Sequence, residues 1–399
     1  MTPAGKPLLV WDGDCGFCRA WIARWQRATG DSVAYAPYQV AASLFPNVPL
    51  ERFKRSVHLF EPGDRMSQGA EAVFRTLAYA PGGGWPLWLY RRLPFFAPAS
   101  EALYWIVARN RRLFSLFTRI AYGRHVIPPG DTLTAWVFLR LLGVIYAIAF
   151  ISLWTQIHGL VGSRGILPVA EFLESVRSRT GPERYWLLPT FSWLGASDLG
   201  LTLQCAAGSA LALLLAIGAA PILTLLGCWA LYLSLANVCR DFLWFQWDGL
   251  LLETGFLAIF LAPWREFSRP GTDPPPARPA LWLVRWLLFR LMLSSAVVKL
   301  TSGDPAWRGL TALEYHYETQ CLPPWTAWYA HHLPAWFHRW ETIGMFAIEG
   351  IAPFLIAAPR LIRFAGAAAM ALTWLVGRLF GDRNVSGLHV SKSVRDGEI

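Results

Sequence analysis

The chain has 399 residues, of which 54% are hydrophobic and 16% charged, and its mean hydropathy is +0.34. A typical soluble domain holds roughly 25% charged residues, so this composition argues against an entirely soluble protein and indicates an integral membrane protein. The net charge is +10, and residues 1–130 hold 16 Lys and Arg against 8 Asp and Glu. Because this basic region precedes hydrophobic segments, it indicates the cytosolic side of a membrane rather than a nucleic-acid partner.

A Cys-x-x-Cys pair lies near the amino terminus, directly after a short apolar segment. Residues 7–11 predict a buried strand, which is too short for the core of a signal peptide, so no cleaved signal is expected. Cys15 and Cys18 follow at the start of an amphipathic helix predicted over 16–28. Mixed strands and helices predict a small α/β domain over 1–125. Its other predicted elements are strands over 33–36 and 56–60 and a helix over 69–79.

Two thiols one helical turn apart at a strand-to-helix turn can form a disulfide and open it again. The helix amino terminus favours the thiolate of Cys15, which would be the nucleophile, and Cys18 would be the resolving thiol. The flanking carboxylates of Asp12 and Asp14 are predicted to raise the pKa of Cys15, which favours a reducing or modestly reactive dithiol. Half of a zinc site and an inert structural pair are the alternatives, but no second pair of zinc ligands follows at suitable spacing.

The segment Asp12-Gly13-Asp14-Cys15-Gly16-Phe17-Cys18 resembles the signature of the DCC family of thiol–disulfide oxidoreductases. Residues 67–72, Ser-Gln-Gly-Ala-Glu-Ala, resemble a second stretch of that family, and the resemblance covers about residues 6–120. It implies a thioredoxin-like fold. The chain departs from thioredoxin itself, because no Trp precedes Cys15, no Pro separates the cysteines and no Pro precedes Ser67.

Residues 85–122 are rich in Trp, Phe and Arg. Such a composition predicts either a segment that lies on a membrane surface or the last helices of the α/β domain. The Pro- and Gly-containing segment around Val126-Ile127-Pro128-Pro129-Gly130 predicts a linker over 126–134.

Longer hydrophobic segments follow, and they predict an all-α, multi-pass transmembrane bundle of about six to seven spans over 135–381. A span needs about 20 apolar residues. A polar tail over 382–399 is expected to be disordered. The candidate spans are 135–155, 199–220, 222–239, 249–263, 280–300, 343–359 and 361–380.

The distribution of basic residues predicts the orientation of the bundle. With the amino-terminal domain in the cytosol, the long loops over 156–198 and 301–342 face outward, and a bacterial cytoplasmic membrane is the expected location. The basic turns on the cytosolic side would carry Arg265, Arg269, Arg278, Arg360 and Arg363.

Two carboxylates, Asp248 and Glu253, lie in an apolar segment, where an ionised group is costly unless it is paired. Arg285, Arg290 and Lys299 of a neighbouring span are the expected counter-charges. Structural pairing and a catalytic or proton-handling role remain the two interpretations of this polar group.

The segment 303–334 is too polar to span the membrane and is predicted to be a client-facing surface. Aromatic side chains such as Tyr315 and Tyr317 dominate many interfaces. A purely structural role, in which the segment seals the bundle, is the alternative. The His and Glu spacing fits no standard zinc pattern, so neither a metal nor another cofactor is expected. The polar residues assigned to this surface are Arg308, His316, Glu318 and His331.

The stretches 156–168, 241–256 and 303–334 together resemble the lipase maturation factor family, over about residues 135–375. That family consists of multi-pass proteins, whose vertebrate members lie in the endoplasmic reticulum and help secreted lipases to reach their active form. More distantly, the bundle resembles the membrane part of vitamin K-dependent carboxylases.

The function hypothesis is a membrane-bound, thiol–disulfide oxidoreductase-like folding or maturation factor for exported proteins. Its partners would be the lipid bilayer, an exported client of lipase type and a thiol or disulfide redox partner. One alternative is a non-redox membrane scaffold or chaperone. Another is a carboxylase-like enzyme that uses Glu253, His316 or Glu318.

Overall fold

The computed structural model describes residues 5–63, 65–123, 126, 130–319 and 324–380, with side chains up to Thr373. The chain divides into two compact units, one built on residues before Gly130 and one on residues from Gly130 to Ile356. The predicted tail and part of the predicted linker lie outside the described residues.

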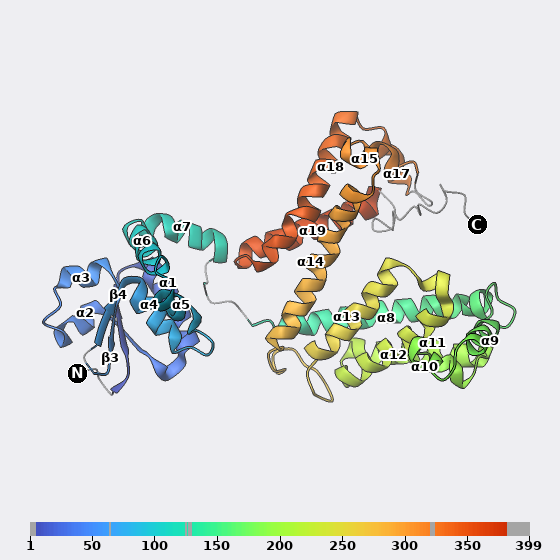
Figure 1. The fold of residues 1–399 in the computed structure, drawn as a ribbon, viewed down its shortest axis with the longest axis horizontal. Helices are drawn as coiled ribbons and strands as arrows, with labels where there is room; N and C mark the ends of the chain where they lie inside the picture. The colour runs from blue at the N-terminus through green and yellow to red at the C-terminus, as the bar shows by residue number, and fades with distance from the viewer. Residues whose placement is uncertain (1–4, 64, 124–125, 127–129, 320–323, 381–399) are drawn as a thin grey trace. The chain divides into compact units, whose positions relative to one another are not determined.

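The first unit is built on a four-stranded sheet (Figure 1), in which the strand order is β2-β1-β3-β4. β1 runs parallel to β2 and antiparallel to β3, and Leu9 of β1 lies opposite Tyr35 and Leu59. Helix α1 connects the two parallel strands, which gives a βαβ unit. The strands are β1 (Leu8–Trp11), β2 (Ala34–Pro37), β3 (His58–Glu61) and β4 (Arg65–Gln68).

Both faces of this sheet are covered, because alternate residues of a strand point to opposite faces. Leu9 and Leu59 pack on one face with Ile22 of α1, and Leu8 and Val10 pack on the other with residues of α2 and α3. The helices are α1 (Gly16–Thr29), α2 (Tyr38–Ala41), α3 (Leu50–Arg55), α4 (Gly69–Ala78), α5 (Trp85–Arg92), α6 (Phe96–Arg109) and α7 (Arg111–Tyr122).

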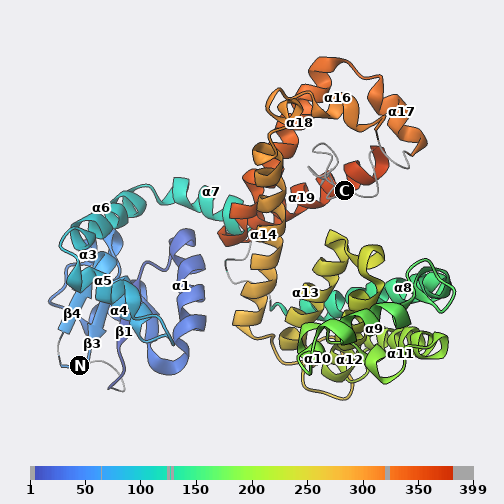
Figure 2. The same ribbon diagram turned by 45° about the vertical axis from the view of Figure 1, so that its right-hand side comes forward.

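The aromatic and arginine-rich residues 85–122 form the last helices of the α/β unit. α5 and α6 pack against α4, and α7 packs against α1 (Figure 2). Phe74 meets Tyr90 edge to face, and Trp21 meets Tyr122 in the same way. This packing supports the interpretation of residues 85–122 as the last helices of the α/β domain rather than as a segment on a membrane surface.

The second unit is helical. Within the described residues, five helical segments are long and apolar enough to cross a membrane: Thr132–Val161, Asp198–Ile217, Pro221–Leu243, Arg278–Thr301 and Ala335–Ala357. The helices between Gly130 and Ile356 are α8 (Thr132–Val161), α9 (Val169–Arg179), α10 (Arg184–Leu187), α11 (Asp198–Ile217), α12 (Pro221–Cys239), α13 (Gln246–Leu261), α14 (Arg278–Thr301), α15 (Pro305–Arg308), α16 (Ala312–His316), α17 (Trp325–His331) and α18 (Ala335–Gly350), and α19 (Arg360–Phe380) follows them.

The predicted count of six to seven spans is not confirmed. The predicted span over 249–263 corresponds to α13, which has 16 residues. At 1.5 Å per residue such a helix is about 24 Å long, shorter than the roughly 30 Å hydrocarbon core of a bilayer. The predicted span over 361–380 corresponds to α19, whose side chains are described only up to Thr373.

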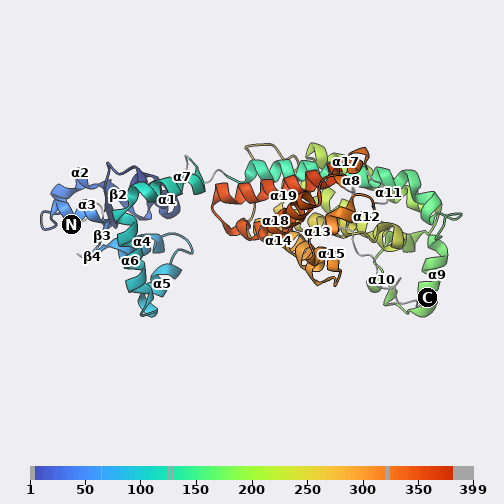
Figure 3. The ribbon, with the colours of Figure 1, turned by 90° about the horizontal axis from the view of Figure 1, so that it is seen from above.

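The core of the second unit lies where α11 and α12 run beside α8 (Figure 3). Tyr146 and Phe150 of α8 are completely buried, and Phe150 contacts Tyr232 of α12 edge to face. Small residues allow the close approach of α8 and α11: a Cβ atom on Gly143 would lie 2.7 Å from the backbone nitrogen of Ala216. Close packing at glycines is typical of helix pairs in membranes.

The opposite face of α8 is also apolar. Leu141, Ile145, Ile148 and Ile151 are all exposed. A helix that is apolar all round, with a buried inner face and an exposed outer face, is typical of a segment in contact with lipid. The second unit is therefore a membrane-embedded bundle.

Candidate functional site

The Cys-x-x-Cys pair lies at the end of β1, where the chain turns into α1. Cys15 is the N-cap residue of α1, and its sulfur accepts a hydrogen bond from the backbone N–H of Cys18 at 3.2 Å. Both thiols are free and partly buried. This geometry places a nucleophilic sulfur at a helix amino terminus, which is the arrangement predicted from the sequence.

The loop before Cys15 is held by residues that follow β2. The Gln39 side chain accepts a hydrogen bond from the Gly13 backbone N–H at 3.1 Å and donates one to the Asp14 carboxylate at 3.0 Å. A Cβ atom on Gly13 would lie 2.8 Å from the Pro37 side chain, so this position requires glycine. The loop is thereby fixed next to the sulfur of Cys15.

Arg111 of α7 is the charged partner that sequence reasoning missed. Its guanidinium donates to the Asp12 carboxylate at 2.9 Å and to the backbone carbonyls of Lys54 and Arg55. Asp12 and Arg111 are 99 positions apart, so no local pattern could have revealed the pair. The only feature of the sequence that pointed to a cation near the dithiol was the cluster of arginines in the segment 85–122.

The hydrogen bond from the Cys18 side chain, with help from the Cys18 backbone N–H and the positive charge of Arg111, lowers the pKa of Cys15 to about 6. Burial and the Asp12 carboxylate oppose this shift but are weaker in sum. The hydrogen bond with Cys15 and burial raise the pKa of Cys18. The predicted upward shift for Cys15 is therefore wrong, because Arg111 compensates Asp12 and Cys18 stabilises the thiolate.

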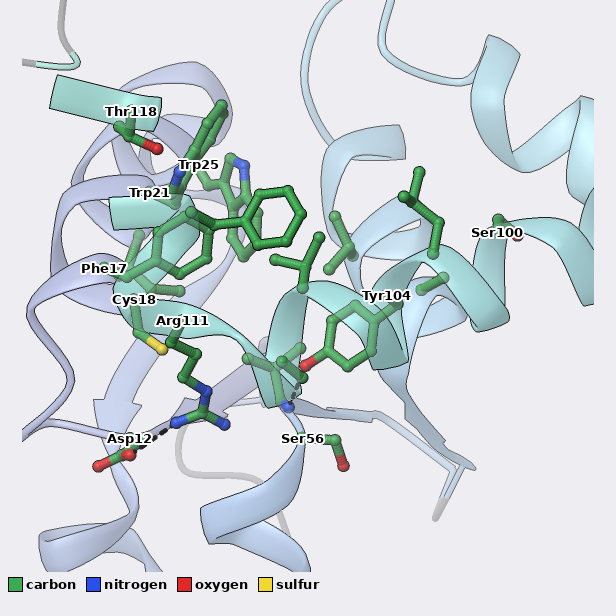
Figure 4. A pocket seen from close by; sticks show the side chains of 18 of the residues that line it. Asp12, Phe17, Cys18, Trp21, Trp25, Ser56, Ser100, Tyr104, Arg111 and Thr118 are labelled. Atoms are coloured by element: carbon green, nitrogen blue, oxygen red, sulfur yellow. Dashed lines mark hydrogen bonds and ion pairs between the residues drawn. The ribbon is translucent and has the colours of Figure 1, made fainter. Parts of the chain in front are cut away.

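A largely apolar cavity of about 580 Å³ adjoins Cys18. Helices α1, α4, α6 and α7 form its walls, and Figure 4 shows the ion pair of Asp12 and Arg111 at the end where the Cys18 sulfur lies. Aromatic side chains line the rest, including Phe17, Trp21 and Trp25. Sequence reasoning did not predict this cavity, since it depends on how α6 and α7 fold back on α1.

In the membrane unit, Asp248 and Glu253 do not form a joint site. The Tyr232 hydroxyl donates to the Asp248 carboxylate at 2.6 Å, and the Phe245 backbone N–H donates to it at 3.3 Å, so Asp248 caps the start of α13. Among the described residues no Lys or Arg forms an ion pair with Asp248, so the expected cationic partner is wrong. Glu253 forms an ion pair with Arg290 of α14, as expected.

The other two expected counter-charges have different partners. Arg285 lies 3.9 Å from Asp131. Lys299 of α14 donates to both carboxylate oxygens of Glu349 in α18, at 2.8 and 2.7 Å, and both side chains are buried. Glu349 was not predicted from the sequence, because only the carboxylates of a different span were considered as partners of Lys299.

The segment 303–334 is partly packed and partly exposed. Arg308 donates to the Leu300 carbonyl at the end of α14, and the His331 ring lies 3.5 Å from Glu318. Tyr315 is exposed, whereas Tyr317 is only 5% exposed and donates to Glu341. Tyr317 is therefore a packing residue, and its prediction as part of a client surface is wrong.

His316 contacts the Tyr317 ring edge to face. Among the described residues, no group of three or more His, Cys, Asp or Glu side chains has the geometry of a metal site.

The two units together define a multi-pass membrane protein that carries an amino-terminal dithiol domain. Residues 133–384 match the family model of the lipase maturation factor transmembrane domain, and residues 9–116 match that of a DCC1-like thiol-disulfide oxidoreductase. The first match covers more than half of the chain. The chain belongs to the lipase maturation factor family.

Several proteins named lipase maturation factor are similar to this chain. Lipase maturation factor 2 of Rattus norvegicus is 46% identical over 269 residues, which are 63% of this chain and 38% of that protein. The Homo sapiens protein of the same name is 44% identical over 280 residues, 65% of this chain and 39% of that protein. Lipase maturation factor 1 of Homo sapiens is 40% identical over 232 residues, 56% of this chain and 41% of that protein.

The chain thus spans about two fifths of the length of these relatives. No solved structure matches it.

Proposed function

We propose that this protein is a membrane-bound maturation factor for exported proteins, in which Cys15 and Cys18 exchange a dithiol and a disulfide with a client. The observation that carries the proposal is the setting of Cys15, an N-cap thiol whose pKa is lowered to about 6 beside a second thiol. At pH 7 such a group is mostly thiolate, and the thiolate is the reactive nucleophile.

The exchange is a two-step reaction. The Cys15 thiolate attacks one sulfur of a client disulfide, so that a Cys15–client bond forms and the client's own S–S bond breaks. Cys18 then loses its proton to the released client thiolate and attacks the Cys15 sulfur, so that the Cys15–Cys18 bond forms and the Cys15–client bond breaks. The second client thiolate takes up a proton from water. The products are a Cys15–Cys18 disulfide and a client with two thiols, and the reverse sequence oxidises the client.

The proposed fold of residues 1–125 is thioredoxin-like, with the domain boundary in the linker 126–134. A Cys-x-x-Cys at the turn of a βαβ unit supports this, since β1, α1 and β2 form such a unit here. The match of residues 9–116 to a thiol-disulfide oxidoreductase model also supports it.

We place this domain on the cytosolic side of a bacterial cytoplasmic membrane. The support is the excess of Lys and Arg in residues 1–130, since basic residues collect on the cytosolic side of a membrane. The segment 303–334 would then face outward. Its exposed aromatic residues, Tyr315, Trp325 and Trp328, are the side chains that we assign to client contact.

The names of the relatives suggest lipase-type clients, because the matched proteins are called lipase maturation factors. We extend this client class to the present chain, which covers about two fifths of those proteins.

Trapping a mixed disulfide tests the proposed function. In the full chain, Cys18→Ser leaves Cys15 able to attack a client but removes the thiol that resolves the bond. We expect this variant to carry exported proteins on Cys15 that a reductant releases. The matched control is the double variant Cys15→Ser/Cys18→Ser, which should carry none.

Two outcomes of the trapping experiment count against the proposal. Equal capture by the single and the double variant would overturn the redox role and favour a non-redox scaffold. The form of the trapped protein tests on which side of the membrane the dithiol domain lies. Precursors that still carry an export signal support the cytosolic side. Mature exported forms alone would place the domain on the opposite side.

A further inference from the structure

The cavity beside Cys18 has the size and lining of a small-molecule site. Its volume of about 580 Å³ lies within the roughly 300–1,000 Å³ of such sites, which are mostly apolar with a few polar groups at fixed places. Aromatic and aliphatic residues of four helices form its walls (Figure 4). A ligand in this cavity would lie next to one sulfur of the Cys-x-x-Cys pair.

The polar end of the cavity offers no free positive charge. The Arg111 guanidinium is engaged by the Asp12 carboxylate and by the carbonyls of Lys54 and Arg55. The charges of Arg111 and Asp12 balance each other, and a Cys15 thiolate nearby adds a negative charge. A carboxylate or phosphate ligand would meet net repulsion here, so the ligand that fits is uncharged.

Hydrogen-bond donors without acceptors line the same cavity. The Tyr104 hydroxyl accepts a hydrogen bond from the Val57 backbone N–H at 2.9 Å, and it donates no hydrogen bond to another of the described residues. The buried indole N–H of Trp21 likewise has no hydrogen-bond partner among them. A ligand that carries carbonyl oxygens would satisfy such donors, because buried polar groups are normally paired.

We infer that this cavity binds a quinone with an apolar side chain, which accepts the electrons of the Cys15–Cys18 dithiol. Such a molecule is flat, apolar and uncharged, carries two carbonyl acceptors and dissolves in the membrane that holds the second unit. This inference rests on the proposed redox function and adds its oxidant.

In the proposed step the quinone oxidises the Cys15–Cys18 dithiol. The Cys15–Cys18 S–S bond forms, and the Cys18 S–H bond breaks. Two electrons pass from the two sulfurs to the quinone ring. The Cys18 proton and one proton from water add to the two quinone oxygens and give a hydroquinone.

Anaerobic reduction of decylubiquinone by the reduced full chain in detergent tests this inference. We expect one hydroquinone per Cys15–Cys18 disulfide, measured by absorbance and by the mass of the alkylated cysteines. The filling variant Ala108→Trp places an indole in the cavity, and its matched control Ala102→Trp makes the same change on the exposed face of α6. The dithiol is oxidised either by the quinone or by glutathione disulfide, and the ratio of these two oxidation rates is compared. It should fall about tenfold in Ala108→Trp and stay unchanged in Ala102→Trp.

The two reactions separate the inference from the proposed function. Oxidation by glutathione disulfide without quinone reduction, or an unchanged rate ratio in Ala108→Trp, would overturn the quinone site and leave the redox role intact. No oxidation by either compound would overturn both. Oleic acid that binds the cavity of wild type but not of Ala108→Trp, with no quinone reduction, would identify an acyl-chain site and also overturn the inference.

Discussion

Alkylation of Cys15 by iodoacetamide should be half-maximal near pH 6 and nearly constant between pH 7 and pH 9. The reason is the pKa of about 6 that the Cys18 hydrogen bonds and Arg111 give to this thiol. An ordinary thiol, with a pKa of about 8.5, would react more than tenfold faster at pH 9 than at pH 7. Cys18, whose pKa is raised, should remain the slower of the two at every pH.

Arg111→Met removes the cation that faces the dithiol. It should raise the pH at which alkylation of Cys15 is half-maximal. Arg112→Met is the matched control, because Arg112 is the next residue of α7, is exposed and does not contribute to either thiol pKa. Mass spectrometry of the two cysteines after brief labelling gives both rates. A midpoint above pH 8, or labelling of both thiols only after unfolding, would contradict the prediction.

Glu349→Gln should destabilise the membrane unit by about 3–5 kcal/mol, because it leaves the Lys299 ammonium buried without a counter-charge. Besides Glu349, Lys299 contacts Ser295 and the ring of Trp307, which are neutral. Thermal unfolding of the full chain in detergent measures this effect as a lower midpoint temperature. The double variant Lys299→Met/Glu349→Leu should recover most of the loss, since it removes both buried charges together.

Glu174→Gln is the matched control for this ion pair. Glu174 and Arg177 of α9 are both well exposed, and exposed pairs of this kind contribute little to stability. The control should leave the midpoint unchanged. A midpoint for Glu349→Gln equal to that of the control would show that the Lys299–Glu349 pair does not hold α14 and α18 together.

The sequence was most informative where local pattern determines structure. The predicted helix over 69–79 is α4, and the predicted helix over 16–28 is α1, because apolar spacing and the Cys15 N-cap position act over a few residues. The long apolar segments likewise predicted most of the membrane helices. A bilayer constrains length and hydropathy strongly, so these segments are visible without any contact information.

The rest depends on contacts between distant residues. Arg111 reaches Asp12 across 99 positions, and Lys299 reaches Glu349 across 50. No single sequence shows which of several cations a buried carboxylate selects, and the prediction that Asp248 pairs with a cation of a neighbouring span failed for this reason. The burial of Tyr317 follows in the same way from its partner Glu341 on α18.

The equilibrium of Cys15 and Cys18 with glutathione tests most directly whether they form a redox-active pair. The full chain is incubated with defined ratios of reduced and oxidised glutathione, and the Cys15–Cys18 disulfide is measured by mass after alkylation. A thiolate with a pKa of about 6 stabilises the reduced form. We therefore predict a midpoint potential between about −270 mV, the value of thioredoxin, and about −120 mV, that of a strongly oxidising periplasmic dithiol. A midpoint below about −300 mV, typical of a structural disulfide, or no disulfide at any ratio, would contradict a redox-active pair.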